Sequence, residues 1–384
     1  MRKLLCSVLA ALILAACASD NVEPPAVLKD VVNPQYKLDE LWSRWISSSD
    51  AKLRVNLRVV HNDQDAFIAT HSGKVYAFGL KSGGTDWDVN TGLAINAGPG
   101  LGEGMLVVAG EDGTVLALDP AGGKTLWKAS VKGEILASPA VGLGSVIIRT
   151  TDGRIMSLSS ADGRTLWKTN YDVPRLTLRG ACDPVIVGRM VLDGMDDGKL
   201  VALNLDDGSQ LWQATVVNPT GSDELARLTD VDGDLAVDGD HVYAAGYHGQ
   251  TVSVLRSNGQ IEWARDLTSY TGVSVDDKYV YVTDLHSAVW ALDKTSGVPV
   301  WTQPEMRAHD LTKPVAFGDD ALVLGGIDGH FHFLSKKDGR VIARGQVGSK
   351  PILAPPVVIG DEVLIYSAAA GTLAAFQVKP VTGG

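Results

Sequence analysis

Cysteine is scarce in this chain of 384 residues, which has only Cys6, Cys17 and Cys182. None of them belongs to a Cys-x-x-Cys motif or a Cys/His cluster, so neither a disulfide framework nor a zinc site is expected. Basic residues are also in deficit, with 34 Lys and Arg against 45 Asp and Glu, and the net charge is −11. Because an acidic surface repels phosphate backbones, nucleic-acid binding is not expected.

Long hydrophobic runs are lacking too. The apolar stretch at residues 4–15 is too short to span a bilayer. It follows Arg2 and Lys3 and ends just before Cys17, which is the arrangement of a signal peptide. Residues 14–17, Leu-Ala-Ala-Cys, resemble the lipobox of bacterial lipoproteins. An ordinary cleavage site with an incidental cysteine is the alternative.

The lipobox resemblance implies three segments. Residues 1–16 would be the signal peptide, and residues 17–36 would hold the lipidated Cys17 and a flexible tether. The remaining residues, 37–384, would form the folded part. Ala18 follows the cysteine where Asp would imply inner-membrane retention, so the resemblance points to the outer membrane of a Gram-negative bacterium, facing the periplasm. Attachment would be through the lipid anchor only.

Aromatic residues are few, 6% of the chain, yet nine are Trp, and their placement reveals a repeat. Six segments run fourteen residues from their first position to a Trp, with Gly ten residues in. A seventh, beginning at Gly329, has Ala343 where Trp is due, and an eighth begins at Gly371 and ends before the Trp position. The six Trp-bearing segments are residues 73–87, 113–127, 153–167, 198–212, 249–263 and 287–301.

The pattern inside the repeat predicts strands and a hairpin. Apolar residues alternate, a small residue recurs four positions after the start in every segment but the seventh, and the second Gly turns the chain back. A further alternating run precedes each segment, so each repeat has about four strands. Eight such units predict an all-β, eight-bladed β-propeller. Trp42, in Glu40-Leu41-Trp42, supplies the missing eighth Trp if the N-terminal strand closes the ring. The Trp residues are then expected to pack between blades.

These blades resemble the quinoprotein repeat of pyrroloquinoline-quinone (PQQ) dehydrogenases. A quinoprotein-type dehydrogenase, or a ligand-binding periplasmic propeller, is therefore one alternative. That resemblance would imply a calcium ion and often adjacent cysteines, and the chain has no adjacent cysteines. Residues 230–234, with three Asp, depart from an EF-hand loop at the required Gly and Glu positions. His330 and His332 are expected to be surface residues. No catalytic residue, metal site or cofactor is predicted.

Two long loops interrupt the repeat, at residues 172–184 and 218–235. Both follow a Trp strand, so they should be neighbours on one rim. Leu176 and Leu178 would lie on one face of a short strand followed by Arg179, and Asp230 and Asp232 lie in the second loop. These residues suit a protein-binding surface. The alternative is that the leucines belong to the core and Arg179 pairs with one of the aspartates.

Both loops resemble the loop motifs of the BamB lipoproteins of the machine that assembles outer-membrane β-barrels. The matching runs are Leu-x-Leu-Arg-Gly at residues 176–180 and Arg-Leu-x-Asp-Val-Asp at residues 227–232. The resemblance implies a non-enzymatic scaffold that docks the periplasmic POTRA repeats of the barrel subunit BamA. It also implies contacts with other Bam subunits and with unfolded outer-membrane proteins. The residues that it implies for docking are Leu176, Leu178, Arg179, Asp230 and Asp232.

Overall fold

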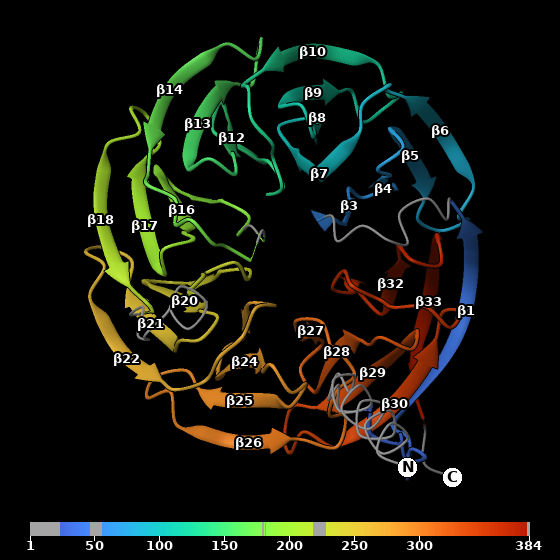
Figure 1. Cartoon of the computed structure of the whole chain (residues 1–384). Helices are drawn as coiled ribbons and strands as arrows, with labels where there is room; N and C mark the ends of the chain where they lie inside the picture. The colour runs from blue at the N-terminus through green and yellow to red at the C-terminus, as the bar shows by residue number, and fades with distance from the viewer. Residues whose placement is uncertain (1–23, 47–55, 179, 181, 218–227, 382–384) are drawn as a thin grey trace, which may run out of the picture.

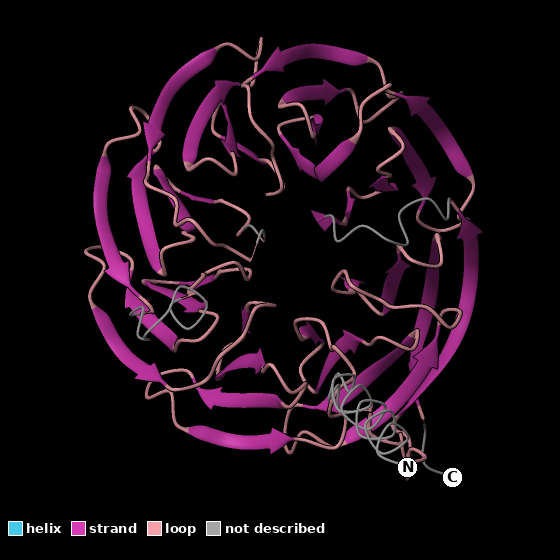
Figure 2. Ribbon diagram, viewed as in Figure 1, coloured by secondary structure: helices cyan, strands magenta, loops and turns pink. Residues whose placement is uncertain are grey.

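The computed structural model describes residues 24–46, 56–178, 180, 182–217 and 228–381. Every regular element in these ranges is a β-strand, and the strands form eight sheets arranged in a ring (Figures 1 and 2). Each sheet has four antiparallel strands, and the second gains a fifth, short parallel strand. The prediction of an eight-bladed propeller is confirmed. In the part of the chain so described, no helix has the length and apolar character of a membrane span.

Seven blades each use consecutive strands, and the last strand of each lies at the perimeter (Figure 1). The first has β3 (Val59–His61), β4 (Asp65–Ala69), β5 (Lys74–Gly79) and β6 (Thr85–Asn90). The second has β7 (Ile95–Gly102), β8 (Met105–Gly110), β9 (Thr114–Leu118) and β10 (Thr125–Ser130), with β2 (Asn56–Leu57) beside β7. The third has β11 (Ala140–Gly142), β12 (Ser145–Arg149), β13 (Arg154–Ser159) and β14 (Thr165–Asn170). The fourth has β15 (Val185–Val187), β16 (Met190–Gly194), β17 (Lys199–Asn204) and β18 (Gln210–Thr215).

The remaining blades complete the ring. The fifth has β19 (Ala236–Asp238), β20 (His241–Ala245), β21 (Thr251–Leu255) and β22 (Ile261–Arg265). The sixth has β23 (Val273–Val275), β24 (Tyr279–Thr283), β25 (Val289–Asp293) and β26 (Pro299–Gln303). The seventh has β27 (Val315–Phe317), β28 (Ala321–Gly325), β29 (His330–Ser335) and β30 (Val341–Gln346). The eighth has β31 (Val357–Ile359), β32 (Glu362–Ser367), β33 (Thr372–Pro380) and the N-terminal β1 (Tyr36–Trp45).

The N-terminal strand closes the ring as predicted. β1 pairs antiparallel with β33 and forms the perimeter strand of the eighth blade, with Trp42 opposite Ala375. The first and last strands of the propeller therefore lie in one sheet, side by side in Figure 1. Closure by main-chain hydrogen bonds joins the two ends of the chain's folded part and pairs an edge of β33 that would otherwise be open.

Each Trp of the repeat joins its own blade to the next one. The indole Nε1 of Trp87 donates a hydrogen bond to the carbonyl oxygen of Pro120 at 2.9 Å. Its ring covers Gly123, whose φ is +69° and where an added Cβ would overlap the indole. The repeated Gly is therefore needed both for the turn and for the close approach of the ring. The same Trp–Gly contact recurs for Trp42–Gly83, Trp127–Gly163, Trp167–Gly208, Trp212–Gly259, Trp263–Gly297 and Trp301–Gly339.

The small residue of the repeat lies directly opposite the Trp on the neighbouring strand. Trp127 pairs with Ala117 and Trp167 with Ser157, for example. A bulge just before each Trp leaves the preceding residue facing solvent, as at Leu126, which is 48% exposed. A large ring and a small neighbour thus share one layer of the sheet, which explains why the two positions recur together.

The junction between the seventh and eighth blades is built differently. Ala343 of β30 lies opposite Phe333 of β29, so the large and small residues have exchanged strands. Tyr36 of β1 then packs against Phe317 and Phe333, with ring centroids 5.7 Å and 5.8 Å apart. The eighth blade takes its perimeter strand from the N-terminus, so it lacks the hairpin whose Gly a Trp would cover. An aromatic residue of β1 packs at this junction instead.

Residues 26–35 precede β1 and lie against the sixth and seventh blades. The main-chain oxygen of Ala26 is 2.8 Å from Nε2 of His309, and Arg344 Nη1 donates to the oxygen of Lys29 at 2.8 Å. The amide of Gln35 donates to the oxygen of Ile342 at 2.8 Å. These contacts hold this part of the expected tether on the propeller surface, whereas Cys17 lies outside the described residues.

Candidate functional site

The two long loops meet on one rim of the propeller. Residues 171–184 connect β14 to β15, and residues 216–235 connect β18 to β19. The amide of Leu178 in the first loop points to the Asp230 carboxylate in the second, with N and Oδ2 3.4 Å apart. The prediction that these loops are neighbours is confirmed. We call the surface formed by residues 176–178 and 180 with residues 228–232 the docking rim.

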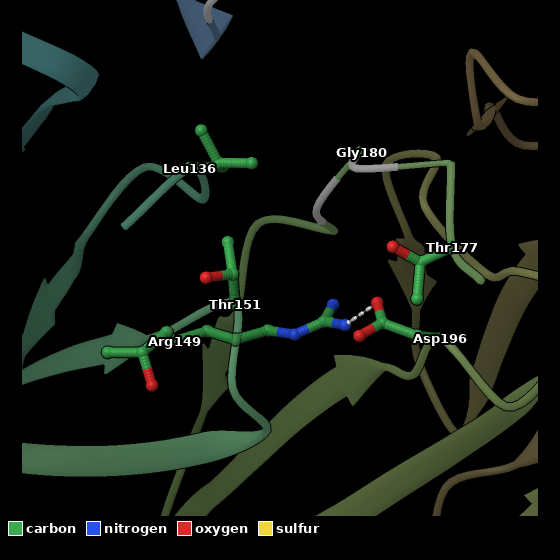
Figure 3. A pocket seen from close by; sticks show the side chains of 7 residues that line it. Leu136, Arg149, Thr151, Thr177, Gly180 and Asp196 are labelled. Carbon is green, nitrogen blue, oxygen red and sulfur yellow. Dashed lines mark hydrogen bonds and ion pairs between the residues drawn. The ribbon is translucent and has the colours of Figure 1, made fainter. Parts of the chain in front are cut away.

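Leu176 and Leu178 face solvent on the docking rim, with 42% and 37% of their surface exposed. They are therefore not core residues. The expected short strand at this place is wrong, since residues 176–178 form an irregular loop. The side chains of residues 176–178 nevertheless alternate in direction as expected. The two leucines face solvent, whereas Thr177 between them lines a pocket with Arg149 and Asp196 (Figure 3). Arg179 lies outside the described residues.

Asp230 and Asp232 lie beneath the leucines. Asp230 is fully buried, and its main-chain oxygen accepts a hydrogen bond from the amide of Tyr247 at 2.7 Å. Gly180 approaches Asp232 so closely that an added Cβ would overlap the carboxylate. This explains the Gly in the Leu-x-Leu-Arg-Gly run. The aspartates support the loop from below and do not form an exposed charged border around the leucines.

Arg149 is the charged centre of this base. It ends β12 and is 3% exposed, and its guanidinium forms an ion pair with Asp196 (Figure 3). A second ion pair, at 3.5 Å, joins it to Asp193. It also donates to the main-chain oxygen of Gly194. Because β12 belongs to the third blade and both aspartates to the fourth, the pairs join two blades under the first loop. Removing one partner of such a buried pair leaves the other charge buried without compensation, which is destabilising.

Sequence reasoning missed Arg149 and Asp193, although the repeat carried a signal for both. Arg149 lies four residues before the first Gly of its segment. The other seven units have a small residue there: Ala69, Ala109, Gly194, Ala245, Thr283, Gly325 and Ser367. Asp193 lies five residues before Gly198, and no other unit has a charged residue at that place. A charged side chain at a small or apolar position of a repeat indicates a local function or a special contact.

Burial dominates the electrostatics of the site. It raises the pKa of Asp193 to about 7, although Arg149 favours the ionised form. Burial and the neighbouring Asp232 also raise the pKa of Asp230. For Arg149, burial opposes the charged form, but Asp193 and Asp196 more than compensate and raise its pKa above the usual value. Burial at the base of the docking rim therefore favours the protonated forms of Asp193 and Asp230 more than water would.

Three carboxylates at this base are close enough to hold a metal ion. Ligand oxygens of Asp196, Asp230 and Asp232 lie within 4.8 Å of one another. Arg149 already pairs with Asp196, however, and its positive charge opposes a cation at the same place. Calcium would also need six to eight oxygen ligands. The arrangement fits a structural ion-pair cluster better than a metal centre.

The two histidines of the seventh blade correct another expectation. His332 is fully buried on β29, where its Nδ1 accepts a hydrogen bond from Arg344 Nε at 3.1 Å. Burial and Arg344 lower its pKa to about 3. The expectation of a surface histidine is wrong there because the side chains of β29 pack inside a blade. His330 is only partly buried and lies 2.8 Å from Asp328. Cys182 is fully buried, as expected for a small apolar residue.

Comparison with known proteins identifies the family. The model of the family "Outer membrane protein assembly factor BamB" matches residues 71–303 and 291–380. The outer membrane protein assembly factor BamB of Alkalilimnicola ehrlichii is 43% identical over 98% of this chain and 97% of its own length. The chain belongs to the BamB family. The prediction of a non-enzymatic assembly factor is thereby confirmed, and the dehydrogenase alternative is set aside.

Solved structures agree with the fold. The crystal structure of BamB from Moraxella catarrhalis has a TM-score of 0.80 and 25% identity, covering 89% of this chain and all of that one. A quinohemoprotein alcohol dehydrogenase from Comamonas testosteroni has a TM-score of 0.72 at 15% identity, covering 88% of this chain and 76% of that one. The second likeness is one of fold alone, and the quinoprotein-type repeat accounts for it.

Proposed function

We propose that this protein, a scaffold of the outer-membrane β-barrel assembly machine, docks the periplasmic POTRA repeats of BamA through its docking rim. The observation that carries the proposal is the pair of exposed leucines, Leu176 and Leu178, on a loop held over a buried charged base. Exposed apolar side chains on a rigid support are typical of protein interfaces, since little ordering is required on binding.

Different residues of the docking rim would have different roles. Leu176 and Leu178 would contact the POTRA surface, and Arg179 would add a charged contact beside them. Asp230 is buried and Asp232 is partly buried, and both would act by holding the first loop in place. Other Bam subunits and unfolded outer-membrane proteins are further partners that the same scaffold would meet. Docking at this loop would orient the periplasmic part of BamA; the irregular form of residues 176–178 does not suit the strand pairing expected from the sequence.

Titration with the soluble POTRA repeats of BamA from the same organism tests the proposal. A chain of residues 18–384 keeps every described residue and lacks Cys17. Leu176→Asp should weaken binding by about tenfold or more, because hot-spot residues typically cost over 1 kcal/mol when lost. Leu211→Asp is the matched control, since Leu211 is 48% exposed near the start of the perimeter strand β18, whose far end leads into the second loop.

Several outcomes of the titration would locate the surface. An unchanged affinity in Leu176→Asp would overturn the site, and an equal loss in Leu211→Asp would do the same. Arg179→Glu should also weaken binding, by charge reversal at the docking rim. No saturable binding by the unaltered chain would contradict the choice of partner.

We also propose that the protein is a lipoprotein of the outer membrane facing the periplasm. Family membership supports the outer membrane, and the lipobox-like residues 14–17 support a lipid on Cys17 after removal of residues 1–16. Mass spectrometry of the mature chain should find acyl chains on an N-terminal Cys17. Cys17→Ser should release the protein from the membrane fraction, and retention of that variant in the membrane would contradict the anchor.

A further inference from the structure

A second charged group, Arg58, lies at the bases of both loops of the docking rim. It follows β2, and its amide donates to the oxygen of Gly98 at 3.3 Å, which fixes its main chain on the second blade. Its guanidinium donates two hydrogen bonds to Asp234, with distances of 2.8 Å and 2.6 Å. Its Nε lies 3.2 Å from a carboxylate oxygen of Asp183. One side chain therefore contacts two aspartates of different blades.

The two aspartates are where the loops of the docking rim end. Asp183 closes the first loop, five residues after Leu178, and Asp234 closes the second, two residues after Asp232. Asp183 also accepts a hydrogen bond from the amide of Ser138 at 2.7 Å. The main-chain oxygen of Asp234 accepts one from the amide of Val273 at 3.0 Å. Each aspartate is thus a fixed end point of its loop.

Lys313 completes a balanced set of charges. It precedes β27 of the seventh blade, and its Nζ donates to Asp234 at 2.6 Å. Two cations, Arg58 and Lys313, therefore face two carboxylates, Asp183 and Asp234. Burial opposes ionisation of Asp234, but Arg58 and Lys313 outweigh it and hold its pKa well below the usual range. The bidentate geometry needs a guanidinium, which a Lys at residue 58 would not reproduce.

We infer that Arg58 is a positioning residue for the docking rim: it ties the ends of both loops to the second blade and so holds the partner-binding leucines in place. This inference rests on the proposed function for its link to binding. In a propeller each blade otherwise contacts its neighbours. Arg58 instead joins the second blade to residues that enter the fourth and fifth, across the ring, and Lys313 adds the seventh.

The test combines amide hydrogen exchange on the free chain with POTRA titration, using Arg58→Met and Lys313→Met. Arg58→Met should speed exchange about tenfold or more in residues 172–178 and in residues 228–234. Loss of the Arg58 ion pairs lowers the free energy that local opening of these segments requires. Lys313→Met should speed exchange mainly in residues 228–234, since the carboxylate to which Lys313 donates is that of Asp234. Arg189→Met, which removes an exposed pair with Asp206, is the control and should change neither.

The readouts separate failure of this inference from failure of the proposed function. Arg58→Met with unchanged exchange in both loops would overturn the positioning role, whatever its affinity. Faster exchange together with weaker POTRA binding supports the inference. Faster exchange with unaltered binding overturns the link to docking. If Arg58→Met does not fold, Arg58→Lys takes its place and should show a smaller acceleration in the same two segments. If the unaltered chain does not bind POTRA, the exchange result still decides whether Arg58 ties the loops.

Discussion

The regular blade junctions and the docking rim use opposite kinds of interaction. At seven junctions a Trp covers a hairpin Gly and donates one hydrogen bond to a carbonyl oxygen, so the contact is apolar, neutral and repeated. Beneath the docking rim the contacts are the buried ion pairs of Arg149 and the partly buried ion pairs of Arg58, and each occurs once. The comparison indicates that the repeat provides stability and that departures from it shape the proposed binding surface.

The largest effect should come from breaking a regular junction. Trp212→Ala removes the ring that covers Gly259 and leaves a cavity between the fourth and fifth blades. We expect a loss of about 3–5 kcal/mol in the free energy of unfolding, as for other buried aromatic residues. Chemical denaturation with fluorescence and circular dichroism would measure it. A loss under about 1 kcal/mol would mean that the Trp contacts do not hold the ring together.

A smaller loss should follow when the charged base is broken. Arg149→Met leaves Asp193 and Asp196 buried without their cation, and we expect about 3 kcal/mol of destabilisation. Unlike Trp212→Ala, it should also speed amide exchange in residues 172–178, which lie over the base. Arg189→Met is the control, since exposed pairs contribute at most about 1 kcal/mol. Equal stability of the two variants would refute a structural role for the Arg149 cluster.

The smallest effect should be the dependence of stability on pH that comes from Asp193, which lies under the docking rim. The pKa of Asp193 is raised to about 7 in the folded state, so that state keeps a proton which the unfolded chain releases near pH 4. The contribution of this proton to the free energy of unfolding is therefore fully present below about pH 4. It is lost as pH rises to about 7, by about 1 kcal/mol per pH unit. Asp193→Asn should lack this fall in denaturation curves measured between pH 5 and 7. An identical slope in both proteins would show that Asp193 does not titrate in this range.

The sequence predicted the regular part of the fold because its signals are local and repeated. Alternation, the hairpin Gly and the Trp spacing lie within fifteen residues of one another, and Trp42 completed the series. The docking rim was harder to predict. Burial of Asp230 depends on two loops that come together only once the blades have formed the ring. Residues 176–178 form an irregular loop in place of the expected strand. The exchange of Phe333 and Ala343 likewise depends on Tyr36, about 300 residues away in the chain.

Amide exchange of residues 18–384 with and without the POTRA repeats of BamA tests the central claim most directly. The account predicts protection of residues 172–178 and 228–234, and no change in perimeter strands such as β18 and β22, whose junctions only support the ring. Protection of the perimeter strands with none at the docking rim would contradict the account, because the regular blades would then carry the binding.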